Sequence, residues 1–316
     1  MREPIRLEAE IPPELQGLRL DQALARLFPD YSRSRLTQWV RSGQVLVDGR
    51  PRKPREPVLG GEQVRVEAEL EVDDAVAPEP IALDIVYRDE ALLVVNKPAG
   101  LVVHPAAGHA AGTLQNALLH HDPGLAQVPR AGIVHRLDKD TSGLMVVARS
   151  IEAHHDLVAQ LQARSVRREY LALVQGELVA GGTIEAPIGR HPVDRKRQAV
   201  TEAGREAITH YRIERRYTGY TLLRVSLETG RTHQIRVHMA HVHHPLVGDP
   251  VYGGRPRIPR GLEAGLRERL QGFPRQALHA QRLGLLHPQT GEEMQWEAPL
   301  PQDMAELLQA MEPLAQ

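Results

Sequence analysis

A short polar stretch near the middle of the chain carries the residue types that could do chemistry. It runs from Ile133 to Leu144 and has Asp138 at its centre, between the cations Arg136 and Lys139. Neighbouring positive charge favours the ionised form of a carboxylate, and an oriented carboxylate can act as a nucleophile or a general base. Asp, Thr, Ser and Gly are also ordinary turn residues, so residue types alone equally allow a simple connection.

The sequence after this stretch indicates how Asp138 would be held. An apolar run from Leu144 to Ala148 predicts a buried strand. The polar residues before the run must then form a loop at the edge of a sheet, and loops fixed by a rigid sheet commonly carry binding or catalytic residues.

Length and composition limit the class of protein. The chain has 316 residues, enough for two domains, and its 39 Lys and Arg nearly balance its 40 Asp and Glu. Net charge therefore neither favours nor opposes nucleic acid as a partner. The absence of cysteine excludes disulfides and thiolate metal sites. Neither a signal peptide nor an apolar run of about 20 residues is found, so we expect a soluble cytoplasmic protein with no membrane partner.

Residues 17–66 predict a small basic domain after an N-terminal extension, 1–16. Apolar residues at helical spacing from Leu18 to Leu27, a helix from Ser32 to Ser42, and a strand from Gln44 to Val47 form the expected elements. Between residues 17 and 60, nine cations face four acids. A basic module in a neutral chain indicates RNA binding.

Residues 67–80 predict a flexible acidic linker, because six acids and two prolines occur there without an aromatic residue. The remaining residues, 81–316, have the composition of a packed domain. Its expected elements are a hairpin within 85–95, strands at 101–105, 166–174, 220–227 and 278–287, helices at 113–120 and 152–164, a basic surface loop at 191–205, and a turn that enters a helix within 228–239.

Several motifs together resemble known families. His-Arg-Leu-Asp at 135–138, followed by Lys-Asp-Thr-Ser-Gly-Leu, resembles the signature loop of the RluA-type pseudouridine synthases. Asn-Lys-Pro-Ala-Gly at 96–100, Thr-Gly-Arg-Thr-His-Gln-Ile-Arg at 229–236 and Gly-Asp-Pro-Val-Tyr-Gly at 248–253 resemble the same family. The segment within 17–66 resembles the S4 RNA-binding domain. The resemblance covers nearly the whole chain and implies an α+β fold, with an S4 module and a catalytic domain on a mixed, mainly antiparallel sheet with flanking helices.

The resemblance also implies an activity and a site. It makes Asp138 the catalytic residue of a uridine-to-pseudouridine isomerase that needs no cofactor and no metal. Arg236 would be its basic partner, with Arg231 as a second candidate for that role or for an RNA phosphate. Tyr170 would stack on the target uracil, although from the residues alone a tyrosine packed in the core is the commoner outcome. Whether Asp138 attacks C1′, attacks C6 or removes the C2′ proton stays open.

The implied partner is RNA. The family members most like this chain act on large-subunit (23S) ribosomal RNA at the helix 69 stem-loop, and either free RNA or the pre-ribosomal large subunit could be the substrate of a monomeric enzyme. A target in folded RNA has to be flipped out of its stack. Arg136 would fill the vacated place, with His135 beside it. Further candidates for RNA contact are Arg33, Arg35, Lys97, Arg195 and Lys196, although Lys97 could equally be a structural lysine.

Three other interpretations fit parts of the sequence. Five histidines between His233 and His244 could hold zinc, but the glutamate usual in such motifs is missing. Asp138 and Asp140 fit the Asp-x-Asp-x-Thr pattern of aspartyl phosphotransferases, but His135 and Arg136 interrupt the apolar strand that such a magnesium site requires. The chain could also bind RNA without any activity. A catalytic Asp138 paired with an arginine would separate an isomerase from all three.

Overall fold

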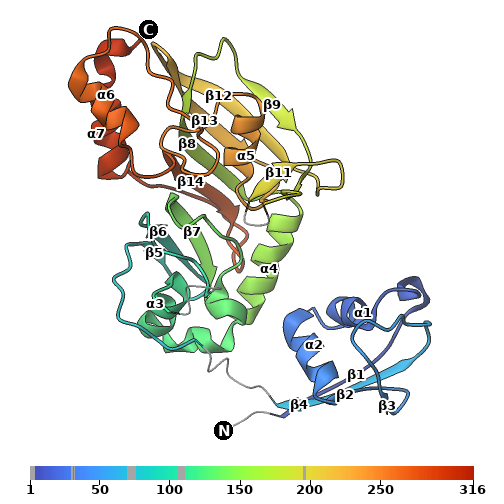
Figure 1. Cartoon of the computed structure of the whole chain (residues 1–316). Coiled ribbons are helices and arrows are strands. Elements are labelled where there is room, and N and C mark those ends of the chain that lie inside the picture. Colours follow the sequence, from blue (N-terminus) through green and yellow to red (C-terminus); the bar gives the residue numbers. More distant parts are fainter. Residues whose placement is uncertain (1–3, 30, 32, 70–75, 106–110, 195–196) are drawn as a thin grey trace. The chain divides into compact units, whose positions relative to one another are not determined.

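The structure is a computed structural model that describes residues 4–29, 31, 33–69, 76–105, 111–194 and 197–316. The chain divides into two compact units, residues 1–75 and 76–316 (Figure 1). Each unit has its own buried apolar cluster, as expected of separate domains.

The first unit packs two helices on a four-stranded sheet. The helices are α1 (Leu20–Leu27) and α2 (Arg33–Arg41), with a 3-10 turn at Pro13–Leu15. The sheet order is β1 (Pro4–Glu10), β4 (Gln63–Glu69), β2 (Val45–Val47) and β3 (Arg50–Pro51). Apolar side chains of both helices and of β2 and β4 form its core, so the two helices and the strand predicted here are confirmed.

The expected boundaries of this unit differ from the structure. Strand β1 pairs antiparallel with β4 over its whole length, and Ile5 and Ile11 are buried in the core. Residues 4–16, expected to belong to an extension, are therefore part of the module. The signal that could have shown this is the strict alternation of apolar and charged residues from Ile5 to Ile11, which is typical of a strand, although the partner strand lies some 60 residues further along the chain.

The expected linker, 67–80, is also shorter than its composition indicated. Glu67 lies in β4, whereas Val76 packs against the core of the second unit. Asn116 Nδ2 donates a hydrogen bond to the carbonyl of Ala77, and the Gly112 N–H donates to the Glu79 carboxylate. Only the middle of the expected linker, 70–75, lies outside the described residues.

The second unit is built on a sheet of nine described strands. Their order is β5 (Ile85–Arg88), β6 (Leu92–Lys97), β7 (Ser142–Ala148), β14 (Leu278–Leu286), β8 (Arg167–Gln175), β13 (Tyr220–Leu227), β12 (Ile208–Tyr217) and β9 (Gly182–Glu185), and β15 (Glu293–Glu297) pairs with β14. Only β7 and β14 run parallel, over the pairs Ser142–His279 and Gly143–Ala280. The expected mixed, mainly antiparallel sheet is confirmed.

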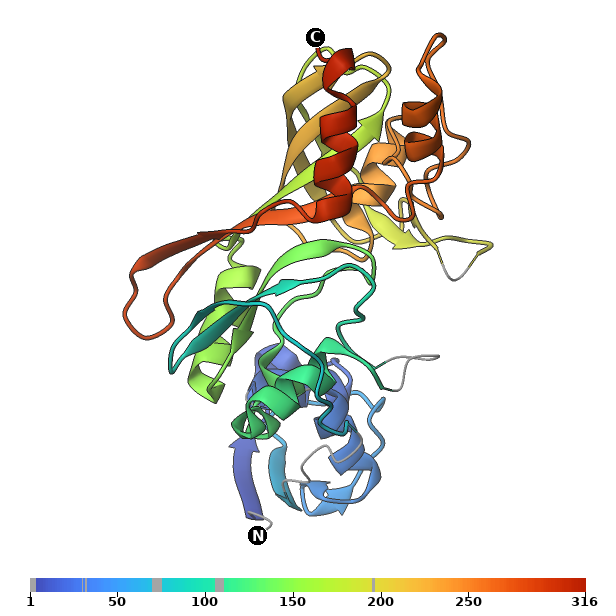
Figure 2. The ribbon, with the colours of Figure 1, turned by 90° about the vertical axis from the view of Figure 1, so that its left-hand side faces the viewer.

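Helices cover both faces of this sheet (Figure 1, Figure 2). Their bounds are α3 (Leu114–His121), α4 (Ile151–Gln162), α5 (Gln234–His241), α6 (Ala264–Gln271) and α7 (Gln302–Ala310). Short 3-10 helices at 123–127, 129–132 and 312–314 complete the unit. On β8, Leu171 and Leu173 share a cluster with α6 and α7, whereas Tyr170 and Ala172 share one with α5. Burial on both faces explains why β8 reads as a nearly continuous apolar run.

Two predicted elements differ in detail. The strand expected at 101–105 is irregular, with one bridge from Val102 to Thr113, because the carbonyls of Val102 and Val103 accept the first N–H groups of α3. The loop expected at 191–205 contains part of a small antiparallel hairpin, β10 (Ile188–Arg190) and β11 (Gln198–Val200). The candidate RNA contacts Arg195 and Lys196 lie between these strands, outside the described residues.

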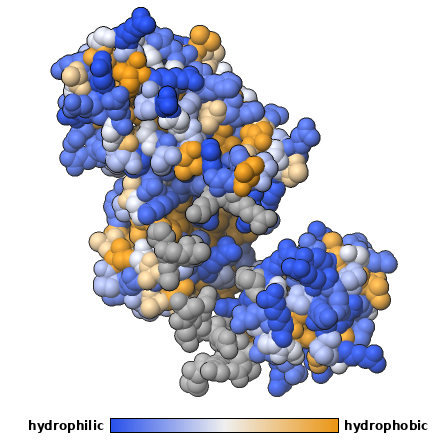
Figure 3. All heavy atoms as spheres, viewed as in Figure 1, coloured by the Kyte–Doolittle hydropathy of each residue, from blue (hydrophilic) through white to orange (hydrophobic). Residues whose placement is uncertain are grey.

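The surface is largely polar in the view that the figures give. On the face shown in Figure 3, apolar residues lie in small groups among hydrophilic ones. None of the helices in the described ranges has both the length and the apolar character needed to span a bilayer.

Candidate active site

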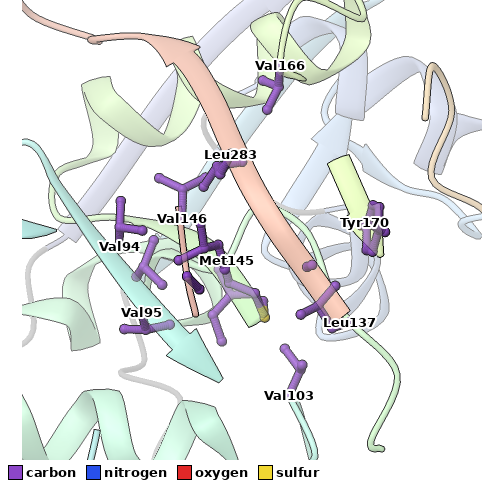
Figure 4. Packing of buried hydrophobic residues seen from close by; sticks show 14 of the residues in the cluster. Val94, Val95, Val103, Leu137, Met145, Val146, Val166, Tyr170 and Leu283 are labelled. Carbon is purple, nitrogen blue, oxygen red and sulfur yellow. The ribbon is translucent and has the colours of Figure 1, made fainter. Parts of the chain in front are cut away.

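The loop that carries Asp138 is anchored by its neighbours on both sides. Leu137 is buried in the main core, in the same cluster as Met145 and Val103 (Figure 4). The Asp138 carbonyl accepts the Thr141 N–H at 3.1 Å, which closes a tight turn. With Leu137 buried, Arg136 and Asp138 on either side of it remain partly exposed. The backbone therefore presents the carboxylate at a fixed position just before β7.

Lys97 holds this loop from the side of β6. Its ammonium donates hydrogen bonds to the carbonyls of Pro98, Leu101 and Lys139 at 2.8, 2.9 and 2.9 Å, and the side chain is almost completely buried. Burial lowers the pKa of Lys97 to about 7, although the charges of Asp140 and Asp138 oppose the shift. The expectation that Lys97 contacts an RNA phosphate is wrong, because its three donors are used inside the protein.

Residues just before and at the start of β14 hold the other end of the loop. Gln276 Nε2 donates to Thr141 Oγ1 at 3.1 Å, and Ser142 Oγ lies 3.0 Å from His279 Nδ1. Gly143 has a φ of +117°, and a Cβ built there would lie 2.2 Å from the Ala280 carbonyl oxygen. The glycine of the signature loop is thus required where β7 and β14 approach each other.

Helix α5 brings a cation to Asp138. Arg236 Nη1 donates to Asp138 Oδ2 at 2.9 Å, while its Nε and Nη2 donate to Asp249 Oδ2 and Oδ1 at 2.7 and 2.9 Å. Arg236 and Asp249 are buried, and the Asp138 side chain is 14% exposed. One guanidinium therefore bridges a buried carboxylate and a carboxylate that solvent reaches.

Electrostatics stabilise this chain of charges. Burial alone would raise the pKa of Asp249, but hydrogen bonds and charge from Arg236, with the N–H groups of Tyr252 and Val251, lower it overall. Burial alone would lower the pKa of Arg236, but Asp249 and then Asp138 raise it overall. Both groups are thus held in their charged forms.

An aromatic ring packs against Arg236, and a histidine lies between that ring and Asp138. Its guanidinium carbon lies 5.1 Å from the centre of the Tyr252 ring, a cation–π distance. The Tyr252 hydroxyl lies 2.9 Å from His233 Nδ1, and His233 Nε2 lies 3.9 Å from Asp138 Oδ1. His233 has a φ of +58°, so the turn into α5 is strained at this point.

The side chains assigned by resemblance meet in one cavity. Its described lining includes Arg136, Asp138, Tyr170, Arg231 and Arg236. Asp138 is the only carboxylate among the described residues that line it. Burial raises the pKa of Tyr170. The charge of Arg168 lowers this pKa and the charge of Asp138 raises it, and the overall shift is upward, so the hydroxyl stays neutral. Of the two arginines considered as partners of Asp138, Arg236 contacts it, whereas Arg231 Nε donates to the Glu206 carbonyl.

The other candidate residues are placed as follows. His135 Nε2 accepts the Val146 N–H at 3.1 Å, and burial, reinforced by Arg168, lowers the pKa of His135 to about 3, so this ring is neutral and tied to β7. Arg136 is exposed at the cavity. In the first unit, Arg33 forms an ion pair with Asp21 at 2.7 Å, and Arg35 lies on the same helix. RNA contact by these residues stays a prediction.

The geometry does not favour the metal-dependent interpretations. Nδ1 and Nε2 of His238 lie 2.8 and 2.9 Å from Thr209 Oγ1 and the Ala186 carbonyl, and His244 Nδ1 lies 2.9 Å from the Gln175 carbonyl. No group of three or more metal-ligating side chains occurs among the residues that were placed. At Asp138, a guanidinium occupies the position that a phosphotransferase would give to magnesium.

Sequence reasoning did not assign roles to Asp249 and Tyr252. Both lie in the Gly-Asp-Pro-Val-Tyr-Gly motif, which was noted for its resemblance alone. The signal that could have found Asp249 is its place at the start of a turn, directly before Pro250. In the structure its Oδ1 accepts the N–H groups of Val251 and Tyr252 at 2.8 and 3.0 Å. Such an acid needs a cation when it is buried.

Comparisons with known proteins show what the chain is similar to. The family model described as RNA pseudouridylate synthase matches residues 91–241, which include Asp138, Tyr170 and Arg236, and the S4 domain model matches residues 18–64. A protein of Pseudomonas aeruginosa named ribosomal large subunit pseudouridine synthase D is 59% identical over 308 residues, which cover 98% of this chain and 96% of the relative. The proteins of that name from Escherichia coli and Xanthomonas campestris are 56% and 55% identical and cover 98% and 96% of this chain, and 96% and 92% of the relatives. The solved structure of human RNA Pseudouridylate Synthase Domain Containing 4 aligns with a TM-score of 0.57 and 25% identity, covering 72% of this chain and 92% of the human one.

Proposed function

Since the chain belongs to the family of RNA pseudouridylate synthases, we propose that it isomerises uridines in large-subunit ribosomal RNA and that Asp138 starts the reaction. The names of relatives that match nearly the whole chain support this substrate. The observation that carries the role of Asp138 is its carboxylate in the cavity wall, held at 2.9 Å by the buried Arg236.

The isomerisation breaks the N1–C1′ bond, turns the uracil, and joins C5 to C1′. No electrons and no external group are exchanged, so a fixed acid–base or nucleophilic carboxylate suffices. Arg236 binds Oδ2 of Asp138, and Asp249 in turn holds Arg236 in place, so the carboxylate is oriented before substrate arrives. A preoriented group contributes to rate because it needs no rearrangement in the transition state.

Two further side chains support the handling of a flipped base. Tyr170 is 6% exposed and lines the cavity beside Asp138, a position from which its ring would stack on the target uracil. Stacking of a base on an aromatic ring contributes about 1–3 kcal/mol. The exposed Arg136 lies close to Asp138 in sequence and would take the place that the base leaves in the RNA.

The S4 module would add affinity through RNA phosphates, with Arg33 and Arg35 among its contacts. We infer that the target stem-loop is helix 69. We also infer that the enzyme acts in the cytoplasm, because ribosomal RNA is located there. We further infer that the enzyme acts as a monomer. These finer assignments rest on the family resemblance.

The test is Asp138→Asn, measured by single-turnover conversion of a large-subunit stem-loop and by RNA affinity. We expect no product and an affinity within about threefold of wild type, because the change keeps the side-chain shape. Asp140→Asn is the matched control, since its backbone carbonyl, and not its carboxylate, accepts the bond from Arg275. Measurable turnover by pure Asp138→Asn protein would refute the role of Asp138.

A second experiment identifies the substrate. Pseudouridines are mapped in ribosomal RNA from cells that lack this protein and from the same cells after its gene is restored. We expect the missing sites in large-subunit RNA. Unchanged large-subunit RNA would reject the proposed substrate while leaving the chemistry of the site untouched.

A further inference from the structure

A second cavity adjoins the one that contains Asp138. The two share Arg136, Arg168 and Arg231, and the second extends from them toward the end of α4. Glu228 is the one acid among its described lining residues. Six arginines line it: Arg130, Arg136, Arg164, Arg168, Arg205 and Arg231. We call this second cavity the arginine groove.

The positive charge of the arginine groove is poorly neutralised by the protein. Among its six arginines, Arg164 alone forms ion pairs with described residues, with Glu228 at 3.0 Å and with Glu206. Arg130 and Arg205 are exposed and form no ion pair with any residue that was placed. Burial lowers the pKa of Arg231, and the nearby charges of Arg205 and Arg164 lower it further. Crowded cations of this kind attract an anion.

Arg168 has an unused donor where the two cavities meet. The residue is 8% exposed, and its Nη2 makes only long hydrogen bonds, of 3.4 and 3.3 Å, to the carbonyls of Leu227 and Glu228. Its buried Nε has no partner among the described residues. A buried donor without an acceptor is costly and the bonds that hold the guanidinium are long, so Arg168 would gain by turning its guanidinium toward a ligand oxygen in the groove.

The backbone around the groove is strained. Arg130 and Arg164 have φ values of +55° and +60°, a left-handed conformation that costs about 1–2 kcal/mol per residue. Of the six non-glycine residues with positive φ in the described chain, these two and His233 line the two cavities. Strain at non-glycine residues is typical of functional sites, because the rest of the fold has to compensate for it.

The groove also has an apolar wall. Ile133 and Val134 from the segment before Asp138, and Val158 and Leu161 from α4, line it together with the arginines. A phosphate alone would need only the cations, whereas an apolar wall beside cations suits a base with its phosphate.

We propose that the arginine groove binds one unstacked nucleotide adjacent to the target uridine, with its phosphate at the arginines and its base against Val158 and Leu161. The inference rests on the proposed function, because the target uridine must occupy the neighbouring cavity. It adds a second position at which the enzyme takes hold of the RNA strand.

Three exposed arginines line the groove without lining the catalytic cavity, and the first test removes the two of them, Arg130 and Arg205, that form no ion pair with a described residue. In Arg130→Ala/Arg205→Ala, we expect stem-loop RNA to bind about 10-fold more weakly. The slope of log affinity against log salt should fall by roughly 0.7 for each single-strand phosphate that the variant no longer binds. Arg267→Ala/Arg269→Ala, which changes two exposed arginines at α6, is the matched control and should bind as wild type does.

The second test concerns the base. Stem-loops with an abasic site on the 5′ or the 3′ side of the target are compared, using wild type, Leu161→Ala and Val158→Ala. We expect one of the two abasic RNAs to bind wild type about 10-fold more weakly, and this penalty to shrink in both variants. Val158→Ala keeps the test valid if Leu161→Ala loses stability.

The outcomes separate the claims. An unchanged salt slope in the double arginine variant, or abasic penalties that are the same in wild type and both α4 variants, would overturn the groove as a nucleotide site. A wild-type enzyme that binds but never converts the stem-loop would instead refute the proposed function.

Discussion

Replacing Asp249 by Asn tests whether the chain of charges behind Asp138 determines the reaction rate. The substitution keeps the shape of the side chain but removes its charge and puts an amide NH2 donor in the place of Oδ2, where Arg236 Nε now donates at 2.7 Å. Asp249 Oδ1 can still accept the N–H groups of Val251 and Tyr252 if the amide oxygen takes that place. The perturbation is therefore confined to Arg236.

The magnitude follows from burial. Side chains of Arg236 and Asp249 are 5% and 0% exposed, and breaking a buried pair by changing one partner costs about 3–5 kcal/mol of unfolding free energy. For a domain of this size, that change lowers Tm by roughly 10 °C. Arg236 would also no longer hold Asp138 in position, and a displacement of about 1 Å at a reacting group reduces the rate about 100-fold.

The assay is single-turnover conversion of the stem-loop at saturating enzyme, well below the Tm of the variant, together with RNA affinity. Asp122→Asn is the matched control, because Arg149 Nε and Nη2 hold Asp122 Oδ2 at 3.0 and 2.8 Å and both side chains are 19% exposed. This control should lose stability and keep its rate. A wild-type rate in Asp249→Asn, despite a lower Tm, would refute the positioning role.

The pH dependence of stability provides a further check. The folded protein lowers the pKa of Asp249 below that of the unfolded chain, so its pairing stabilises the protein above the unfolded value, near 3.8, and the stabilisation disappears as pH falls through the folded pKa. The difference in unfolding free energy between wild type and Asp249→Asn should therefore be constant at neutral pH and shrink below about pH 4.

Three further predictions follow from the same structure. Lys97→Met should slow turnover, leave RNA affinity within about twofold, and cost about 1–3 kcal/mol of unfolding free energy at pH 7. The pKa of Lys97 is about 7 in the folded protein and 10.5 in the unfolded chain, so between these pH values the unfolding free energy of wild type should rise relative to that of the variant by at most about 1.4 kcal/mol per pH unit. Chemical denaturation at several pH values measures this difference. Gly143→Ala should lower the unfolding free energy by about 3 kcal/mol or more, because the new Cβ would overlap the Ala280 carbonyl. Gly291→Ala, whose new Cβ would lie in open space, is the control and should cost about 1 kcal/mol. Equal losses in thermal melting would contradict the close approach of Gly143 to Ala280. A protein that starts at Val76 should convert stem-loop RNA at high concentration but bind it with a shallower salt slope; an unchanged slope in a binding titration would mean that the first unit does not contact the substrate.

The sequence predicted well the features that depend on neighbouring residues. The apolar run at β7, the Thr113 cap of α3 and the turn that enters α5 are all local patterns, and each is present. The resemblance also selected Asp138 and Arg236, which lie in contact although 98 residues separate them.

The features that sequence reasoning missed depend on distant partners. Strand β1 alternates apolar and charged residues, but this local pattern does not show that its partner is β4. Lys97 looked like a surface cation because its three acceptors are backbone carbonyls, which no side-chain pattern reveals. Asp249 became meaningful only when the fold brought Arg236 beside it, since burial turns an ordinary turn acid into a fixed counter-ion.

The parallel pairing of β7 with β14 has a consequence for the order in which the enzyme is built. Ser142 and His279, which meet there, are 137 residues apart in the chain. Pairings at such separation form late, because closing the intervening loop costs entropy before any stabilising interaction is made. At a synthesis rate of about 5–20 residues per second, roughly ten seconds pass between the appearance of Asp138 and that of β14. The first unit is complete by then, so a growing chain could hold RNA well before it can modify it.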